Sequence, residues 1–144
     1  MKHFECKSCG NLVSTLNYSG KPISCCSAVM REVVPKVEGE GSEKHTPTVK
    51  VKDGVATVSI GTEGNMHPMD SDHRISWICL VTNDGTYRKL LPPTKYAVAR
   101  FHLEDNEHVI RAFAFCNKHG TLVCNCESRE ACESGECGKG KERR

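Results

Sequence analysis

The feature that most constrains the fold is a series of short apolar segments within residues 43–124, separated by turn sequences. Both alternating sets of residues 75–82 are largely apolar, which favours a central strand buried on both faces. Asn83-Asp84-Gly85 is a strong hairpin signal, and Pro92-Pro93 interrupts the segment that follows it. No segment shows helical periodicity over more than two turns. We therefore expect an antiparallel β-sandwich of about seven strands.

Further strands are predicted where apolar residues alternate or cluster between turn residues. Ala97, Ala99 and Phe101 are expected to face the core, with Arg100 and His102 on the opposite face. The expected strands of the whole chain are residues 11–16, 55–60, 75–82, 86–91, 97–103, 109–115 and 121–124.

Composition limits the classes of function. The 144 residues carry a formal charge of +2, and the scattered basic residues form no patch, so we do not expect nucleic-acid binding. No run of about 18 apolar residues predicts a membrane span. Residues 1–9 contain no apolar signal segment, so the ten cysteines are interpreted as reduced, metal-binding thiols of a cytoplasmic protein.

Four cysteines lie in the first 36 residues, in the pattern Cys6-x2-Cys9-x15-Cys25-Cys26. Four thiolates bind zinc or iron in a tetrahedron, and the x2 spacing lets one turn place two sulfurs on one ion. The spacing alone favours a structural zinc that stabilises a very small domain, while leaving a one-electron iron site open. The Glu-Gly-rich residues 35–42 are interpreted as a linker or loop.

A second candidate site combines one cysteine with four histidines. Cys116 and His119 form a Cys-x-x-His pair after an apolar segment, and His45, His67 and His73 lie in turn-like sequences beside predicted strands. One thiolate and four imidazoles exceed the four ligands of a structural zinc site. They suit an iron centre that keeps one position open for a small molecule.

The remaining histidines and one cysteine are given simpler interpretations. His3, His102 and His108 are expected to be surface residues, and Cys79 is expected to be a small core residue of its strand.

Residues 127–144 form a polar, cysteine-containing tail. With the end of the preceding strand, its cysteines could bind zinc or an iron–sulfur cluster, but the spacing matches no established motif, so a disordered, reduced tail without a bound cluster is favoured. The cysteines concerned are Cys124, Cys126, Cys132 and Cys137.

Taken together and in order, these motifs resemble desulfoferrodoxin, the two-iron superoxide reductase family. The likeness extends to about Cys126 and is carried by the N-terminal cysteines together with Glu43-Lys44-His45-x-Pro47, His67-Pro68-Met69, His73-x-Ile75-x-Trp77-Ile78 and Cys116-Asn117-x-His119-Gly120. Arg74, Lys118 and Thr121 depart from the residues common in the family, but none of them is a predicted ligand.

The resemblance implies a domain plan and two iron sites. Residues 1–36 would be a desulforedoxin- or rubredoxin-like domain with iron on Cys6, Cys9, Cys25 and Cys26. Residues 37–126 would be an immunoglobulin-like catalytic sandwich, followed by the tail at 127–144. It also implies a square-pyramidal ferrous ion, with His45, His67, His73 and His119 as equatorial ligands and Cys116 as the axial ligand. The open position, trans to sulfur, would receive superoxide.

By the same resemblance, Glu43 would bind the ferric ion after product leaves, and Lys44 would attract the anionic substrate. The activity implied is one-electron reduction of superoxide to hydrogen peroxide, in a homodimer that receives electrons from a small donor such as rubredoxin in an anaerobic or microaerophilic cytoplasm. Two alternatives stay open. One is an electron-transfer iron protein without a catalytic role, and the other is a zinc-binding interaction module.

Overall fold

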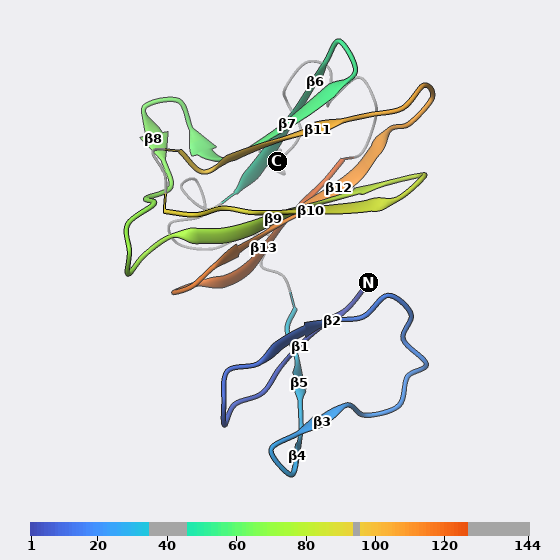
Figure 1. The fold of residues 1–144 in the computed structure, drawn as a ribbon, viewed down its shortest axis with the longest axis vertical. Helices are drawn as coiled ribbons and strands as arrows, with labels where there is room; N and C mark the ends of the chain where they lie inside the picture. The colour runs from blue at the N-terminus through green and yellow to red at the C-terminus, as the bar shows by residue number, and fades with distance from the viewer. Residues whose placement is uncertain (35–45, 94–95, 127–144) are drawn as a thin grey trace, which may run out of the picture. The chain divides into compact units, whose positions relative to one another are not determined.

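The computed structural model describes residues 1–34, 46–93 and 96–126, which contain strands and turns but no helix (Figure 1). In these residues no helix is long and apolar enough to cross a membrane. The chain divides into two compact units, Met1–Val34 and Pro35–Arg144. The domain ends expected at residues 36 and 126 stay predictions.

The first unit is built from very short strands. A three-stranded antiparallel sheet has the order β2-β1-β5, and β3 pairs with β4. The strands are β1 (His3–Glu5), β2 (Leu12–Ser14), β3 (Ser24–Cys25), β4 (Ala28–Val29) and β5 (Arg31–Glu32). Its buried apolar core consists of Phe4, Cys6 and Met30. A core of this size rarely stabilises a domain alone, and small domains of this kind usually depend on a metal or on disulfides.

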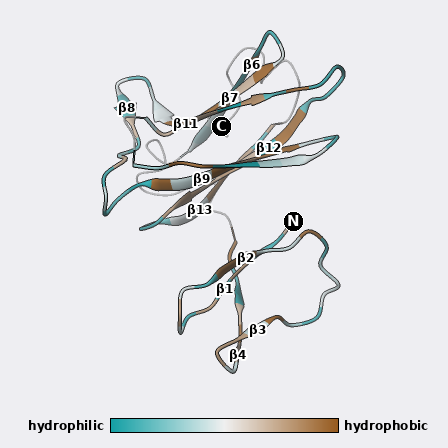
Figure 2. Cartoon of the chain, viewed as in Figure 1, coloured by the Kyte–Doolittle hydropathy of each residue, from teal (hydrophilic) through white to brown (hydrophobic). Residues whose placement is uncertain are grey.

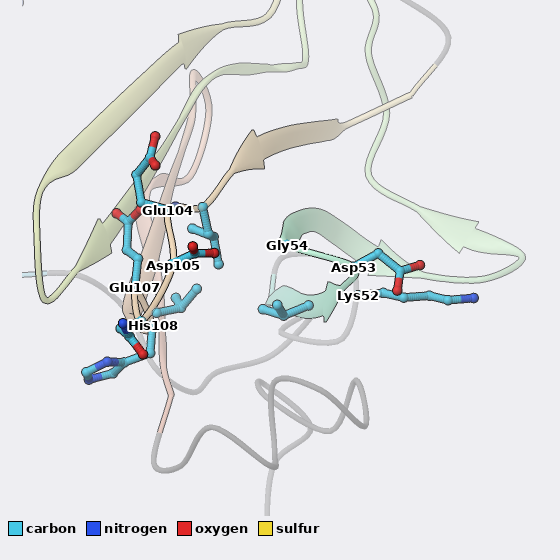
Figure 3. A pocket seen from close by; sticks show the side chains of 11 residues that line it. Lys52, Asp53, Gly54, Glu104, Asp105, Glu107 and His108 are labelled. Carbon is cyan, nitrogen blue, oxygen red and sulfur yellow. Dashed lines mark hydrogen bonds between the residues drawn. The ribbon is translucent and has the colours of Figure 1, made fainter.

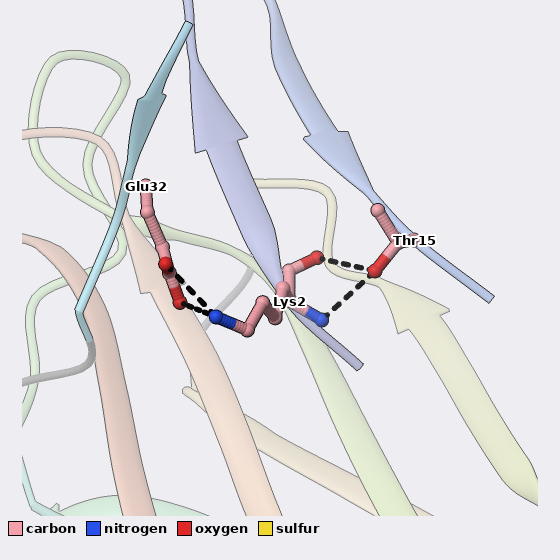
Figure 4. Close-up of polar contacts among 3 residues, drawn as sticks. All are labelled: Lys2, Thr15 and Glu32. Atoms are coloured by element: carbon pink, nitrogen blue, oxygen red, sulfur yellow. Dashed lines mark hydrogen bonds and ion pairs between the residues drawn. The ribbon is translucent and has the colours of Figure 1, made fainter. Parts of the chain in front are cut away.

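Lys2 connects the ends of this small sheet (Figure 4). Its backbone N–H donates to the hydroxyl of Thr15 over 3.0 Å, and its Nζ lies 2.8 Å from Oε1 of Glu32. The ion pair is half exposed, so its contribution to stability is small. The Lys2–Thr15 contacts extend the pairing of β1 with β2 by one residue at the end away from Cys6.

The second unit is a two-layer antiparallel sandwich (Figure 1). One sheet has the order β10-β9-β12-β13, and the other has the order β11-β7-β6, with β8 paired to β7. The strands are β6 (Pro47–Lys52), β7 (Val55–Thr62), β8 (Asn65–Met66), β9 (Ile75–Thr82), β10 (Thr86–Leu90), β11 (Val98–His102), β12 (Val109–Cys116) and β13 (Gly120–Asn125). The all-β fold class predicted from the sequence is confirmed.

The core lies between the two sheets, and apolar residues concentrate on the strands (Figure 2). Ile78 and Leu80 of β9 and Val58 of β7 are fully buried in this core, and the alternation along β9 places Ile78 and Leu80 on the same face. Ala99 and Phe101 face this core and Arg100 is exposed, as expected.

Two features of the fold were not anticipated. Strand β6 was missed, although Val49 and Val51 alternate with Thr48 and Lys50; Val49 is fully buried. The prediction that His3 is a surface residue is wrong. His3 is 2% exposed, and its Nδ1 lies 2.7 Å from the hydroxyl of Ser14 on the paired strand. β1 is the central strand of the β2-β1-β5 sheet, so its side chains are covered by neighbours on both sides.

A cavity of about 500 Å³ lies between the β6–β7 turn and the β11–β12 connection (Figure 3). Beside it, Glu107 is 5% exposed; its carboxylate accepts from the Thr82 hydroxyl over 2.5 Å and from the Glu104 backbone N–H over 2.8 Å. The Thr82 hydroxyl and the Glu104 backbone lower the pKa of Glu107. The carboxylate therefore fastens the β11–β12 connection to the end of β9.

Replacing Glu107 by Gln is expected to lower the free energy of unfolding by about 1–3 kcal/mol at neutral pH, since the carboxylate accepts these two hydrogen bonds through two oxygens and an amide has only one acceptor oxygen. Because the folded-state pKa is depressed, this stabilisation is present above the ordinary value of 4.5 and is lost as pH falls below it. The difference from wild type in denaturant titrations should therefore shrink at acid pH. Exposed Glu104→Gln is the control, and a pH-independent difference would contradict the prediction.

Candidate metal centres

The β12–β13 hairpin places Cys116 and His119 side by side. Cys116, the last residue of β12, pairs with Gly120, so the three intervening residues form the turn. Gly120 has φ +83°, a conformation that glycine adopts without strain and that commonly closes three-residue hairpin loops. The Sγ of Cys116 lies 3.4 Å from Nδ1 of His119. The turn of the hairpin therefore places the sulfur of Cys116 beside a ring nitrogen of His119.

Cys116 faces the interior because it continues the alternation of Ala112 and Ala114, which lie in the same core. A β-bulge lies opposite it in β9: Phe115 pairs with Trp77, but Cys116 pairs with Ile75, so Ser76 is passed over in the register. Phe115 and Trp77 stack with ring centroids 5.8 Å apart and planes 9° from parallel. The side chain of Cys116 is 0% exposed.

His67 reaches the same place from the other sheet. It follows β8, and its backbone N–H donates to the carbonyl of Ile60 over 3.0 Å. Gly61, with φ +94°, permits this close approach, since a Cβ there would lie 2.5 Å from Asn65 O and 2.9 Å from His67 N. Nδ1 of His67 lies 2.7 Å from Pro68 O. Only a protonated Nδ1 can donate to a carbonyl, so the lone pair of the neutral ring is on Nε2.

His73 completes the described group. It lies just before β9, with its ring centroid 4.7 Å from that of His67 and 5.1 Å from that of His119. One ligand atom from each of His67, His73, Cys116 and His119 lies within 4.8 Å of the others. Cys116 and His67 are buried, His73 is half-buried and His119 is exposed. The group therefore extends from the core to the surface.

These distances fit a metal ion. With bonds of ~2.3 Å to sulfur and ~2.1 Å to nitrogen, two neighbouring ligand atoms lie ~3.1 Å apart at a right angle and ~3.6 Å apart at a tetrahedral angle. The 3.4 Å between Cys116 Sγ and His119 Nδ1 lies between these values. Imidazole and thiolate together suit zinc, iron and copper better than calcium or magnesium.

The four N-terminal thiols form the second group. Cys6 and Cys9 lie on one turn, in which the N–H of Gly10 donates to Cys6 O, and Cys26 and Ser27 turn the opposing loop with positive φ angles. Cys25 Sγ lies 3.7 Å from Cys9 Sγ and 3.9 Å from Cys26 Sγ. A tetrahedron with ~2.3 Å metal–sulfur bonds has edges of ~3.8 Å. Disulfides need ~2.0 Å, and these cysteines are free.

Electrostatics favours a cation among these thiols. The backbone N–H of Cys9 lowers the pKa of Cys6 to about 6. The neighbouring thiol groups of Cys9, Cys25 and Cys6 raise the pKa of Cys26 to about 12. One sulfur is thus readily ionised and another strongly resists ionisation, so four thiolates can coexist only around a positive ion. The side-chain amide of Asn11, 3.5 Å from Cys25 Sγ, adds a donor to this sulfur.

The other candidates separate into three kinds. Glu43, Lys44, His45, Cys132 and Cys137 lie outside the described residues. Cys124 lies in the sandwich core and Cys126 packs against it, so the first two cysteines of the proposed tail site belong to the β13 region. Cys79 is 3% exposed, and burial raises its pKa to about 11, in agreement with the core role predicted for it.

Comparison with known proteins identifies the family. The desulfoferrodoxin family model matches residues 37–124, which include His67, His73, Cys116 and His119. The chain belongs to the desulfoferrodoxin family. A desulfoferrodoxin homologue of Methanothermobacter thermautotrophicus is 35% identical over 118 residues, covering 81% of this chain and 92% of the relative. Desulfoferrodoxin of Desulfarculus baarsii is 33% identical over 117 residues, covering 81% and 90%.

Solved structures of the same family are also similar. The superoxide reductase of Treponema pallidum has a TM-score of 0.68 and 31% identity, covering 85% of this chain and 94% of that one. The superoxide reductase of Giardia intestinalis has a TM-score of 0.50 and 30% identity, covering 60% of this chain and 99% of that one. The predicted desulfoferrodoxin relationship is confirmed, and the family binds iron, as expected for both groups.

The sequence reasoning missed two residues that shape the three-histidine group. Gly61 was not singled out, although a glycine within a strand often marks a close backbone approach. Asn117 was read only as part of the Cys116-Asn117-x-His119 motif, and its side chain contacts residues more than forty positions away.

Replacing Gly61 by Ala is expected to weaken metal retention at the His67 group. A methyl group there collides with backbone atoms, which cannot rotate away. Gly64→Ala is the matched control, because Gly64 also has positive φ (+78°) but open space around it. The control should cost about 1–3 kcal/mol from backbone strain alone. Gly61→Ala should cost more in denaturant titrations and should bind less metal, so equal behaviour of the two variants would contradict the close-approach argument.

Proposed function

We propose that this protein is a superoxide reductase that converts superoxide to hydrogen peroxide with an electron from an external donor. The observation that carries the proposal is the gathering of three imidazoles and one buried thiolate at one end of the sandwich, within 4.8 Å of one another. The net reaction takes up one superoxide, one electron and two protons and yields one hydrogen peroxide. No dioxygen is formed.

His67, His73, His119 and Cys116 would hold the catalytic iron, with His45 as a further ligand. His45 lies outside the described residues, but the following residue, Thr46, accepts a hydrogen bond from Gly61 N over 3.4 Å, close to the His67 segment. Iron held by these residues would supply the one-electron chemistry, with the electron replaced by the external donor. The four-thiolate group would hold a second iron suited to one-electron transfer.

The protein groups around this site have distinct tasks. Neutral imidazoles hold the metal without adding negative charge, which would repel an anionic substrate. The buried thiolate of Cys116 donates electron density to the metal, as thiolates do in haem enzymes. The Pro68 carbonyl fixes the ring of His67 in one tautomer. Exposed His119 and half-buried His73 mark the side from which a small anion can enter.

We further propose the roles of the residues outside the described part of the chain. Lys44 attracts superoxide to the site, and Glu43 binds the oxidised iron after product leaves. Residues 1–36 would form the four-thiolate domain and residues 37–126 the catalytic domain, ahead of the tail at 127–144. A small electron-donor protein such as rubredoxin, a homodimeric assembly and a cytoplasmic location complete the proposal.

His67→Ala is expected to lower the rate constant for reaction with superoxide at least tenfold, since even residues that merely support a metal ligand cost 10–100-fold when changed. Exposed His102→Ala, in the same sandwich, is the control and should react like wild type. The measurement is pulse radiolysis on anaerobically purified protein, with iron counted per chain. An unchanged rate for His67→Ala would favour a pure electron carrier. A colourless, zinc-containing protein would favour a structural module.

Lys44→Ala is expected to slow the bimolecular reaction and to flatten its dependence on ionic strength, because screening by salt acts on a charge that steers the substrate. Exposed Lys50→Ala is the matched control. In the same series, Glu43→Ala should keep fast reduction of superoxide and change the visible spectrum of the ferric protein. A Lys44→Ala rate constant equal to wild type at low salt would remove the steering role, and an identical ferric spectrum would remove the role of Glu43.

A further inference from the structure

Asn117 connects the two loops that carry the metal-binding side chains. Its side-chain Oδ1 accepts a hydrogen bond from the backbone N–H of Arg74 over 2.9 Å, and its Nδ2 donates to the carbonyl of Asp72 over 2.8 Å. Its own backbone N–H donates to the carbonyl of Arg74 over 3.2 Å. The two side-chain bonds therefore fasten the residues immediately before and after His73.

We infer that Asn117 is a positioning residue that fixes His73 relative to Cys116 and His119. The inference rests on the proposed function of this group as the catalytic iron site. None of the three hydrogen bonds of Asn117 goes to a ligand atom; Asn117 acts through the backbone on both sides of His73.

The register of the sheet explains why such a connection is needed. Regular pairing of β12 with β9 ends at the bulge, where Cys116 pairs with Ile75. His73 lies before this last pair on the β9 side and His119 lies after it on the β12 side, so the regular β9–β12 pairing does not reach either residue. The three hydrogen bonds of Asn117 extend the connection between β9 and β12 past the bulge to Asp72.

The chemistry of the side chain is specific. One carboxamide presents an acceptor and a donor, and here each is used on a different backbone group. Aspartate has the same size but cannot donate to the Asp72 carbonyl. Asn117 is exposed, so its contribution comes from these bonds and not from burial of apolar surface.

Two further hydrogen bonds and one ion pair near His73 are local or weak. Asp70 N–H donates to His73 O over 3.0 Å, and the Arg74 guanidinium donates to Ser71 O over 2.8 Å. These bonds shape the turn without fixing its distance from Cys116. The ion pair from Lys118 to Asp72 spans 4.0 Å between exposed groups and contributes little.

The experiment compares Asn117→Asp and Asn117→Ala with wild type in the full-length, iron-loaded chain. Asn83→Asp is the matched control, because Asn83 Oδ1 also accepts a backbone N–H, from His108, at the far end of β9. Release of iron to a chelator is followed separately for the two sites, so that the four-thiolate site serves as an internal reference. The thiolate-to-iron absorption of the oxidised Cys116 site is recorded, and unfolding is followed by the fluorescence of Trp77, the single tryptophan.

Both Asn117 variants are expected to release iron from the Cys116 site about 10–100-fold faster and to shift its absorption band, with the four-thiolate site unchanged. Asn83→Asp should match wild type. The inference is overturned if release from the Cys116 site stays within about twofold of wild type, or if the band keeps its position and faster release is matched by an equal loss of stability in the Trp77 signal. Superoxide reactivity is measured separately, so a chain that binds iron but does not react with superoxide would reject the proposed function while leaving this comparison intact.

Discussion

The break in register between β9 and β12 is the constraint on which the three-histidine group depends. From Arg111 to Phe115 the pairing is regular, and Trp77 stacks on Phe115. Ser76 of β9 is then passed over, so that Cys116 pairs with Ile75 and both side chains lie in the core. The hairpin that follows brings His119 to within 3.4 Å of the Cys116 sulfur. A uniform ladder would have continued the alternation of Leu80 and Ile78 and directed Ser76, not Ile75, into the core beside Cys116.

The two candidate metal groups differ in how much the stability of the surrounding unit depends on them. The first unit buries only three apolar residues, so an ion bound by four thiolates would be a principal source of its stability. The sandwich has an extensive core of its own and carries its group at one end of the sheets. The sandwich therefore does not depend on a metal ion for its core, and its ligands can serve reactivity. They include a buried thiolate on one side and an exposed imidazole on the other. Such a difference suits one site for electron storage and the other for contact with a small anion.

Backbone groups, more than other side chains, hold the histidine ligands in place. The Pro68 carbonyl sets the tautomer of His67, and Gly61 allows its strand to approach. Asn117 connects to backbone groups on each side of His73. Backbone atoms placed by two packed sheets move little, so a metal centre assembled from separate segments keeps its geometry.

The sequence by itself determined the elements and the pairs that depend on local spacing. Alternation in residues 75–82 predicted a strand buried on both faces, and Cys-x2-Cys and Cys-x2-His spacing predicted pairs that one turn can bring together. The family resemblance extended these pairs to two groups of ligands. The tertiary structure alone decided which segments that are distant in the sequence contact each other and which side chains they bury. Burial of His3, the bulge at Cys116 and the contacts of Asn117 across more than forty residues leave no periodic signal, because they arise only when strands pair and sheets pack.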